Sequence, residues 1–432
     1  MKKIIPVLMV VLIAAGWASA FLSNSTTSNA YEEYMETARD YVERGLYELA
    51  IQKYDSAISV DSTDTAWEEK MAAYALWYAE DTGCYSDYLE DAVAAIAAKP
   101  KVAAYVITAA ELYMKNSKYE SAVKVIETAL ENGLESDDLS ALLLEAKYAY
   151  SIGWKGYDAV SLCSEDYYAV ASGELWAYIE ADGSTTDYES LLFASRVGED
   201  GMRLVQDETR AFLIDEDDVI QGILDFEPDA AGVYAEGLIA ISKDGSYGYY
   251  DSLGDYQFGD YDEAGTFTDG KAAVKDGDVW YLIDTTGAKV SEETYDDIVL
   301  CEDGTYLLDD VMIASQNGVY SIYTDGEASG SYEDADLVTK DGIIAVCSDG
   351  LWGYVNLKGE EVIAPTYEAA LSFSNGLAAV CIDDKWGFID EDGNLVIECL
   401  FYGAGYFNSE GFCMAETADG TQWQLIELLA GL

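Results

Sequence analysis

Residues 373–393 have the sequence FSNGLAAVCIDDKWGFIDEDG, which contains two short apolar runs and two turns. A third apolar run, residues 395–397, follows at once. Within residues 386–389 the side chains alternate between two faces, as a β-strand requires. Asp392-Gly393 is a hairpin signal, because glycine adopts a positive φ at little cost. The stretch therefore predicts short strands joined by tight turns.

The same pattern recurs across residues 160–432, and Trp352 precedes Trp386 by 34 residues. A glycine lies ten residues before the aromatic position in five copies, and another lies seven residues after it in six copies. A tyrosine follows 12 to 15 residues after this position in several copies. The eight copies have at this position Trp176, Ala211, Tyr247, Trp280, Val319, Trp352, Trp386 and Trp423. Three markers in phase predict a β domain of about eight units.

The motif Trp-Gly-Tyr/Phe-Ile/Val-Asp-x-x-Gly resembles the WG β-repeat family of bacterial proteins. The best matches are residues 342–367 and 376–397, whereas the copies near residues 211 and 319 lack the Trp and the Gly. The resemblance implies a repeat-built β domain, with no enzymatic activity assigned to the repeat itself. The expected structural signature consists of Trp176, Gly248, Trp280, Trp352, Gly353, Trp386, Gly387 and Trp423.

One unit of this size cannot bury both of its faces, so neighbouring units must supply the core. We expect the Trp to be a large packing anchor between repeats. The adjacent Gly is expected to let a neighbouring backbone approach closely. Eight copies can close into a propeller-like ring, which protects strand edges. An open solenoid of β-hairpins is the alternative, and the spacing does not decide between the two.

Residues 30–154 have a different, helical pattern, in which Gly and Pro are rare and apolar residues recur every three or four positions. Tyr47, Tyr85 and Tyr119 each open a helix and lie 38 and 34 residues apart. The pattern resembles the tetratricopeptide repeat, with the signature residues Tyr47, Ala50, Tyr119 and Ala122. The resemblance implies a concave helical surface for peptide binding, and an ordinary bundle of α-hairpins is the alternative. A final helix from Ser136 to Ser151 is expected to cap the array.

The first 22 residues predict export. Two lysines precede an apolar run over residues 4–22, and residues 18–20 fit a small-x-small cleavage site. The run has nearly the length needed to span a bilayer, so it is either an N-terminal membrane anchor or a cleaved signal peptide. Residues 23–29 are predicted to be a linker. The rest of the protein is expected outside the cytoplasm, anchored to the membrane or secreted, with membrane contact only through residues 4–22.

The charge and composition exclude several functions. The chain has 82 acidic and 23 basic residues, a net charge of −59, which repels nucleic acid and leaves cationic partners favoured. It has no His, which excludes Ser-His-Asp and Cys-His catalysis and His-based zinc sites. The seven cysteines have no disulfide-framework spacing. Cys347 and Cys381 occupy equivalent positions in their repeats and are expected to be small buried side chains.

The carboxylates give no clear catalytic or metal site. Residues 390–394 resemble part of a calcium loop but lack its full pattern, so they are expected to form a hairpin turn. Most other acidic residues also fall at predicted turns. We therefore predict no catalytic residue, no cofactor and no metal ligand, with calcium as a minor alternative.

The sequence thus predicts a multidomain α + β protein, with residues 1–22 as the signal or anchor helix, 30–154 helical and 160–432 all-β. The predicted function is non-catalytic binding or scaffolding outside the cytoplasm, with protein or peptide partners. A carbohydrate- or cell-wall-binding surface protein is the alternative, and exposed tyrosines such as Tyr402 and Tyr406 are candidates for it. An enzyme of unrecognised type is a second alternative, which would need a pocket holding two carboxylates.

Overall fold

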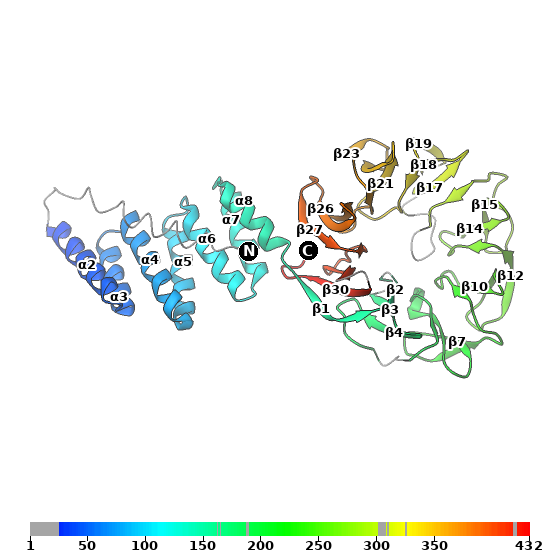
Figure 1. Ribbon diagram of the computed structural model, residues 1–432, viewed down its shortest axis with the longest axis horizontal. Helices are drawn as coiled ribbons and strands as arrows, with labels where there is room; N and C mark the ends of the chain where they lie inside the picture. Colours follow the sequence, from blue (N-terminus) through cyan, green and yellow to red (C-terminus); the bar gives the residue numbers. More distant parts are fainter. Residues whose placement is uncertain are drawn as a thin grey trace. The chain divides into compact units, whose positions relative to one another are not determined.

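The computed structural model describes residues 26–161, 163–164, 166–186, 190–300, 308, 311–324, 326–417 and 421–432. The chain divides into two compact units, Met1–Ala149 and Tyr150–Leu432 (Figure 1). The predicted signal or anchor, residues 1–22, lies outside the described residues. Among the helices that the structure describes, none is both long enough and apolar enough to span a membrane.

The described part of the first unit contains seven α-helices, which pack one after another along the chain. They are α2 (Thr26–Glu43), α3 (Tyr47–Val60), α4 (Asp64–Glu80), α5 (Tyr85–Ala98), α6 (Ala103–Lys115), α7 (Tyr119–Glu131) and α8 (Asp137–Lys147), with the short 3-10 helix η2 (Thr82–Cys84). Tyr47, Tyr85 and Tyr119 are each the first residue of the second helix of a pair. Figure 1 shows the helices as successive antiparallel hairpins.

Two boundaries of this unit differ from the sequence prediction. Helix α2 begins at Thr26, so the last four residues of the predicted linker 23–29 are helical. The final helix begins after its N-cap Ser136, whose hydroxyl accepts a hydrogen bond from the backbone N–H of Leu139, but it ends at Lys147 rather than Ser151. The chain becomes extended at Tyr150 because strand β1 (Tyr150–Tyr157) pairs with a strand from the far end of the sequence.

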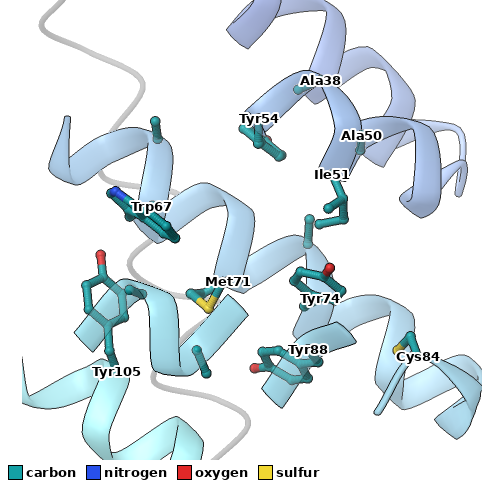
Figure 2. Packing of buried hydrophobic residues seen from close by; sticks show 14 of the residues in the cluster. Ala38, Ala50, Ile51, Tyr54, Trp67, Met71, Tyr74, Cys84, Tyr88 and Tyr105 are labelled. Carbon is teal, nitrogen blue, oxygen red and sulfur yellow. The ribbon is translucent and has the colours of Figure 1, made fainter. Parts of the chain in front are cut away.

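The core of the helical unit combines small residues with aromatic rings (Figure 2). Ala38 and Ala50 are fully buried, which lets α2 and α3 approach closely. Tyr74 of α4 and Tyr88 of α5 stack with ring centroids 5.1 Å apart. Stacked aromatic pairs add stabilisation beyond the apolar area they bury, so these rings fix α4 against α5.

The second unit is an eight-bladed β-propeller, in which each blade is an antiparallel sheet. Blades 1 to 4 are β2 (Ala159–Val160), β3 (Tyr167–Ser172) and β4 (Leu175–Glu180); β5 (Phe193–Ala194), β6 (Arg203–Gln206), β7 (Ala211–Ile214) and β8 (Ile220–Ile223); β9 (Ala230–Ala231), β10 (Ile239–Lys243), β11 (Ser246–Tyr250) and β12 (Tyr256–Tyr261); β13 (Glu263–Ala264), β14 (Lys271–Asp276) and β15 (Val279–Asp284). A short 3-10 helix, η3 (Glu199–Gly201), lies between β5 and β6.

Blades 5 to 8 follow the same plan of a two-residue strand, a hairpin of two longer strands and an outer strand. They are β16 (Asp297–Ile298), β17 (Val311–Gln316), β18 (Val319–Thr324) and β19 (Glu327–Tyr332); β20 (Asp334–Ala335), β21 (Ile343–Ser348), β22 (Leu351–Asn356) and β23 (Glu361–Tyr367); β24 (Ala369–Ala370), β25 (Leu377–Ile382), β26 (Lys385–Asp390) and β27 (Leu395–Phe401); β28 (Gly403–Ala404), β29 (Phe412–Thr417) and β30 (Gln422–Leu428), completed by β1.

The ring closes because β1 pairs antiparallel with β30, so that Tyr150 faces Leu428 and Tyr157 faces Trp423. The two strands lie side by side in Figure 1. Blade 8 therefore takes its outer strand from the N-terminal end of the unit. The predicted ring is confirmed and the open solenoid is wrong, but the β unit begins at Tyr150 rather than at residue 160.

The propeller core lies between blades. For example, Ala345 and Tyr354 of blade 6 pack in one buried cluster with Phe373 and Val380 of blade 7. A second cluster joins Tyr249 of blade 3 to blade 4. Each blade thus buries its faces against its neighbours, as a unit of this size requires.

Candidate binding site at the propeller seam

The predicted signature residues lie on the third strand of their blades, but the Trp is not the most buried ring. Trp280 is 2% exposed, whereas the signature tryptophans of the other copies are only half-buried. The fully buried ring lies two residues further along. The buried rings at this position are Tyr178, Tyr249, Tyr354 and Phe388. Trp280 and Trp352 pack in clusters that join neighbouring blades, as expected of a packing anchor. Trp386, in contrast, is only half-buried, and Phe388 is the more deeply buried ring of its strand.

The signature glycines allow a close backbone approach within a blade. A Cβ on Gly387 would lie 2.5 Å from the carbonyl oxygen of Ile397, and one on Gly353 would lie 2.6 Å from that of Ile363. At both positions the outer strand has a β-bulge, because the pairing register shifts there. Gly248 likewise lies against the ring of Tyr256. The glycine is therefore needed inside the repeat, rather than between repeats.

Carboxylates that recur with the repeat hold its hairpin turns. In six blades, the acidic residue immediately before the two-residue strand accepts a hydrogen bond from a backbone N–H in the next hairpin turn, at 2.6–3.1 Å. We call these six residues the turn clamps. They are Asp158, Asp229, Asp262, Asp296, Glu333 and Glu368.

A second set of side chains closes the turns that follow the third strand. The side-chain oxygen accepts hydrogen bonds from backbone N–H groups two and four residues ahead, at 2.8–3.1 Å. The residues are Asp215, Asp251, Asp284, Asn356 and Asp390. Such bonds favour the charged carboxylate, and they lower the pKa of Asp215 below the ordinary value. The pKa of Asp284 is lowered by the hydroxyl of Thr286 first and by these backbone bonds second.

This geometry bears on the suggested calcium loop at residues 390–394. One carboxylate oxygen of Asp390 accepts the N–H of Asp392 and of Asn394, and the other accepts the side-chain amide of Asn394. The segment is a hairpin turn that uses its own carboxylate. In the described residues, no group of three acidic or cysteine side chains is arranged to hold a metal ion.

The cysteines that the structure describes are free and shielded. Cys347 and Cys381 are 8% and 9% exposed, and each thiol lies near the turn clamp of its own blade, Glu333 or Glu368. Burial raises the pKa of the Cys163 thiol to about 11. Raised thiol pKa values disfavour the nucleophilic thiolate, so these side chains fill space, as predicted for Cys347 and Cys381.

The closing strand β1 has a bulge at the place where the outer strands of blades 6 and 7 have theirs, but it carries a Trp there. Between Ile152 and Gly156, three residues of β1 lie opposite the single residue Leu425 of β30. The bulge is held by the side-chain amide of Gln424, which donates to the carbonyl oxygen of Gly153 at 2.7 Å. A bulge re-aims a side chain, and here it carries Trp154 outward.

Trp154 is 91% exposed. At the equivalent bulges, blade 6 has the short segment Ala364-Pro365 and blade 7 has Glu398-Cys399. Trp154 and its neighbour Lys155 border a hollow of about 200 Å³ at the seam between blades 8 and 1. The hollow is lined by Ser151, Gly153, Trp154, Lys155, Tyr157, Ile179, Asp182, Gly183, Phe412, Leu425 and Glu427. An exposed Trp at such a place has no packing role that the fold requires.

A second hollow adjoins the first, since Asp182 lines both. Its volume is about 370 Å³, and its charged lining residues are all acidic: Asp166, Glu180, Asp182 and Glu410. The carboxylate of Asp182 accepts hydrogen bonds from Ser184, which lower its pKa. The seam thus places an exposed indole beside a group of carboxylates.

Two cations of the helical unit form ion pairs between separate helices. Lys70 of α4 is 2% exposed and pairs with Asp55 of α3 and with Asp91 of α5, the latter at 2.7 Å. Arg39 of α2 makes a two-point ion pair with Glu69 of α4, both bonds at 2.8 Å. These pairs tie successive helices together, which leaves an excess of acidic side chains on the surface of the unit.

The predicted helical signature residues have structural positions in this unit. Ala50 and Ala122 are fully buried, where a larger side chain would separate the helices. Tyr47 and Tyr119 are half-buried at the helix starts, and the hydroxyl of Tyr47 donates to Glu80 at 2.9 Å.

Sequence reasoning missed Trp154. Its position fell inside the predicted helical region 30–154, where an aromatic residue is expected to pack. The available signal was the pair of glycines, Gly153 and Gly156, that flank Trp154-Lys155 just where the helical period stops. The exposed tyrosines suggested for sugar binding lie elsewhere: Tyr402 is 45% exposed, and Tyr406 donates to the half-buried Asp336 at 2.6 Å.

The fold and this seam define the class: an eight-bladed propeller built of short β repeats, joined to a unit of helical hairpins. The family described as the WG containing repeat matches the chain at residues 247–280, 352–386 and 386–419. These segments lie in blades 3 and 4 and in blades 6 to 8. No curated protein matches the chain.

Among solved structures, the chain is similar to PorZ of Porphyromonas gingivalis, described as an essential bacterial surface component of the type-IX secretion system. The identity is 7% and the TM-score 0.33, with 64% of this chain and 46% of the PorZ chain covered. The AfRom2 CNH domain aligns with 8% identity and a TM-score of 0.34, covering 66% of this chain and 99% of that domain. The chain thus spans less than half of the PorZ chain.

Proposed function

We propose that this protein is a non-catalytic binding or scaffold protein that acts outside the cytoplasm and engages a protein partner. The observation that supports this most is the contrast between the repeat and its exception. The recurring carboxylates hold turns, whereas Trp154 lies on the bulge of β1 and is presented to solvent. An indole presented to solvent beside a hollow is suited to binding, because Trp is enriched where partners dock.

The helical unit is proposed to act as a tetratricopeptide-like peptide-binding array. Its support is the series of three helix pairs, each with a tyrosine opening the second helix, and a capping helix α8. Location outside the cytoplasm is proposed from residues 1–22, with anchoring or secretion depending on whether this segment is cleaved.

A photo-cross-linking experiment tests the proposal. p-Benzoylphenylalanine would replace Trp154 in one version of the full-length protein and Leu253, an apolar residue that is 59% exposed elsewhere on the propeller, in a control version. A third version would carry it at Leu49 of α3, which is 42% exposed. Expressed in the native cells, we expect a discrete cross-linked protein from position 154 or 49 and none from position 253. Absence of any cross-link specific to positions 154 and 49 would contradict the proposal.

A carbohydrate- or cell-wall-binding role is the second candidate, and the exposed Trp154 ring favours it, since sugars stack on such rings. Sedimentation with purified wall polymers tests this role. Binding that is lost in Trp154→Ala but kept in Leu253→Ala would support it, and absence of sedimentation would remove it.

A further inference from the structure

We propose that the seam between blades 8 and 1 captures a basic side chain, arginine or lysine, from an exposed segment of the protein partner. This inference rests on the proposed binding function and names the chemistry of the ligand. The site consists of the Trp154 hollow and the acidic hollow, which meet at Asp182.

The first element of the site is the exposed indole. A guanidinium or ammonium group over the face of a Trp ring is attracted by the electrons of that face, and Trp is the strongest of the aromatic side chains in this respect. The bulge between Ile152 and Gly156 holds Trp154 away from the sheet, so that its ring is 91% exposed. The hollow that Trp154 borders is also lined by the apolar residues Ile179 and Leu425, which suit the methylene stem of a long basic side chain.

The second element is the charge next to the indole. The acidic hollow has four carboxylates and no basic residue among its lining residues. Three of these carboxylates make no hydrogen bond or ion pair with other described residues, whereas the turn clamps do. They belong to Asp166, Glu180 and Glu410. A basic side chain would therefore find unpaired acceptors there. Carboxylates match a guanidinium in two-point geometry.

The one cation at the site is already engaged. The ammonium of Lys155 lies 5.1 Å from the centre of the Tyr157 ring. The lining of the two hollows taken together has five acidic residues, Asp166, Glu180, Asp182, Glu410 and Glu427, against this single Lys. The net charge of −59 over the whole chain acts in the same direction, by attracting a basic partner from a distance.

The edge of blade 8 argues against a partner that adds a strand. β1 is the outermost strand of its sheet, and a regular edge would invite such pairing. The bulge at residues 153–155 interrupts the row of backbone donors and acceptors, as edge strands do where pairing is avoided. Recognition through side chains is the remaining mode that this edge supports.

Fluorescence anisotropy with the full-length protein tests the inference. The probe is a fluorescein-labelled peptide, Gly-Leu-Arg-Gly-Leu-Arg-Gly, and its twin carries citrulline, the neutral analogue, in place of arginine. We expect the arginine peptide to bind at least about tenfold more tightly, as charge-assisted pairing and cation–π contact require. We expect Trp154→Ala to weaken binding about threefold to tenfold.

Matched variants separate the site from the general negative charge. Glu180→Gln with Glu410→Gln removes two seam carboxylates, and Glu361→Gln with Glu391→Gln removes two exposed carboxylates elsewhere. The first pair is expected to weaken binding at least about fivefold more than the second, because only the first lies within contact distance of the bound side chain.

Equal binding of the two peptides, or equal effects of the two double variants, would overturn the inference. Binding of chitotetraose that depends on Trp154, together with no preference for the arginine peptide, would assign the seam to a glycan instead. A cross-link at position 49 or 154 with no arginine preference would leave the proposed binding function standing while this inference fails.

Discussion

The helical unit and the propeller use the same excess of acidic residues in different ways. In the helical unit, carboxylates of separate helices converge on a few cations, as Asp55 and Asp91 do on Lys70. In the propeller, carboxylates accept backbone N–H groups in their own blade, as Glu368 does from Asp384 at 3.1 Å. The first arrangement joins side chains of separate helices, and the second fixes a hairpin turn to a strand of the same blade, over similar separations of 15 and 16 residues in the sequence.

This difference teaches where each unit is vulnerable. A helical array has few long-range backbone hydrogen bonds, so its side chains must hold one hairpin against the next. A propeller blade has its sheet hydrogen bonds and needs charge only at the turns, while its blades are held together by buried rings. Substitutions in the two units should therefore lower the free energy of unfolding for different reasons.

The largest effect is expected from the ring at the blade interface. Phe388→Ala should lower the free energy of unfolding of the propeller by about 3–5 kcal/mol, because the ring is 1% exposed and its loss leaves a cavity. Trp386→Ala should cost clearly less, because that ring is half-buried. Denaturant unfolding followed by tyrosine and tryptophan fluorescence measures both. If Trp386→Ala proved the more damaging, the Trp would be the main anchor after all.

The next effect concerns the helical unit. Lys70→Met should lower its free energy of unfolding by about 2 kcal/mol, because Asp55 and Asp91 lose their shared partner. The loss is set below that of a fully buried pair because both carboxylates keep some exposure to water. Circular dichroism at a helical wavelength should show a destabilised helical transition, while the propeller transition stays in place. A shift of both transitions would contradict the separate use of charge in the two units.

A smaller effect is expected from the turn clamps. Glu368→Ala should cost about 1 kcal/mol, because the backbone N–H of Asp384 loses its acceptor in a partly exposed turn. Glu391→Ala, an exposed carboxylate outside the clamp positions, should stay within about 0.5 kcal/mol of the parent protein. Thermal unfolding of the two variants side by side provides the measurement, and equal losses would show that the clamp is not stabilising.

The smallest effect is a change in the pH dependence of stability. Burial raises the pKa of Asp336 above its ordinary value, and hydrogen bonds from Tyr406 and from the backbone N–H of Ser372 oppose this only in part. The folded protein therefore keeps this proton to a higher pH than the unfolded chain. The stabilisation that Asp336 contributes is fully present at pH values below its pKa in the unfolded chain. It is lost as the pH rises through its pKa in the folded protein.

Asp336→Asn removes this titration. The variant's free energy of unfolding should fall less than the parent's as the pH rises above the ordinary range for aspartate, and urea unfolding at a series of pH values measures the difference. Asp215 and Asp284 act with the opposite sign, because their lowered pKa values give stability that is lost as the pH falls. An unchanged slope in Asp336→Asn would mean that the protonation of the Asp336 carboxyl group is not linked to folding.

Much of the fold could be predicted because each repeat carries its own markers. The eight units follow from the spacing of the aromatic and glycine positions, and the helix starts at Tyr47, Tyr85 and Tyr119 follow from periodicity. The closing strand could not be found in this way. β1 ends in a repeat tyrosine, Tyr157, but it precedes the first aromatic position of the repeat, and it pairs with a strand 266 to 278 residues away.

The turn clamps were visible in the sequence as an acidic residue after the repeat tyrosine, as in Tyr332-Glu333 and Tyr367-Glu368. This pattern does not distinguish the clamps by itself, because acidic residues are common throughout the chain. The seam site was harder, because the bulge is common to several blades and only the residue that it carries differs. Trp154 becomes a candidate only when its bulge and its exposure are known.

The pairing of Tyr150 with Leu428 also sets the order in which the propeller can form during synthesis. The strand made first in this unit must wait for the strand made last. At roughly 5–20 residues per second, the 278 residues between them take roughly 15–55 seconds to synthesise. Throughout that interval β1 has no partner, and seven blades can assemble only as an open arc with two exposed ends. A nascent chain of this kind needs either protection of those ends or passage from the ribosome in an unfolded state.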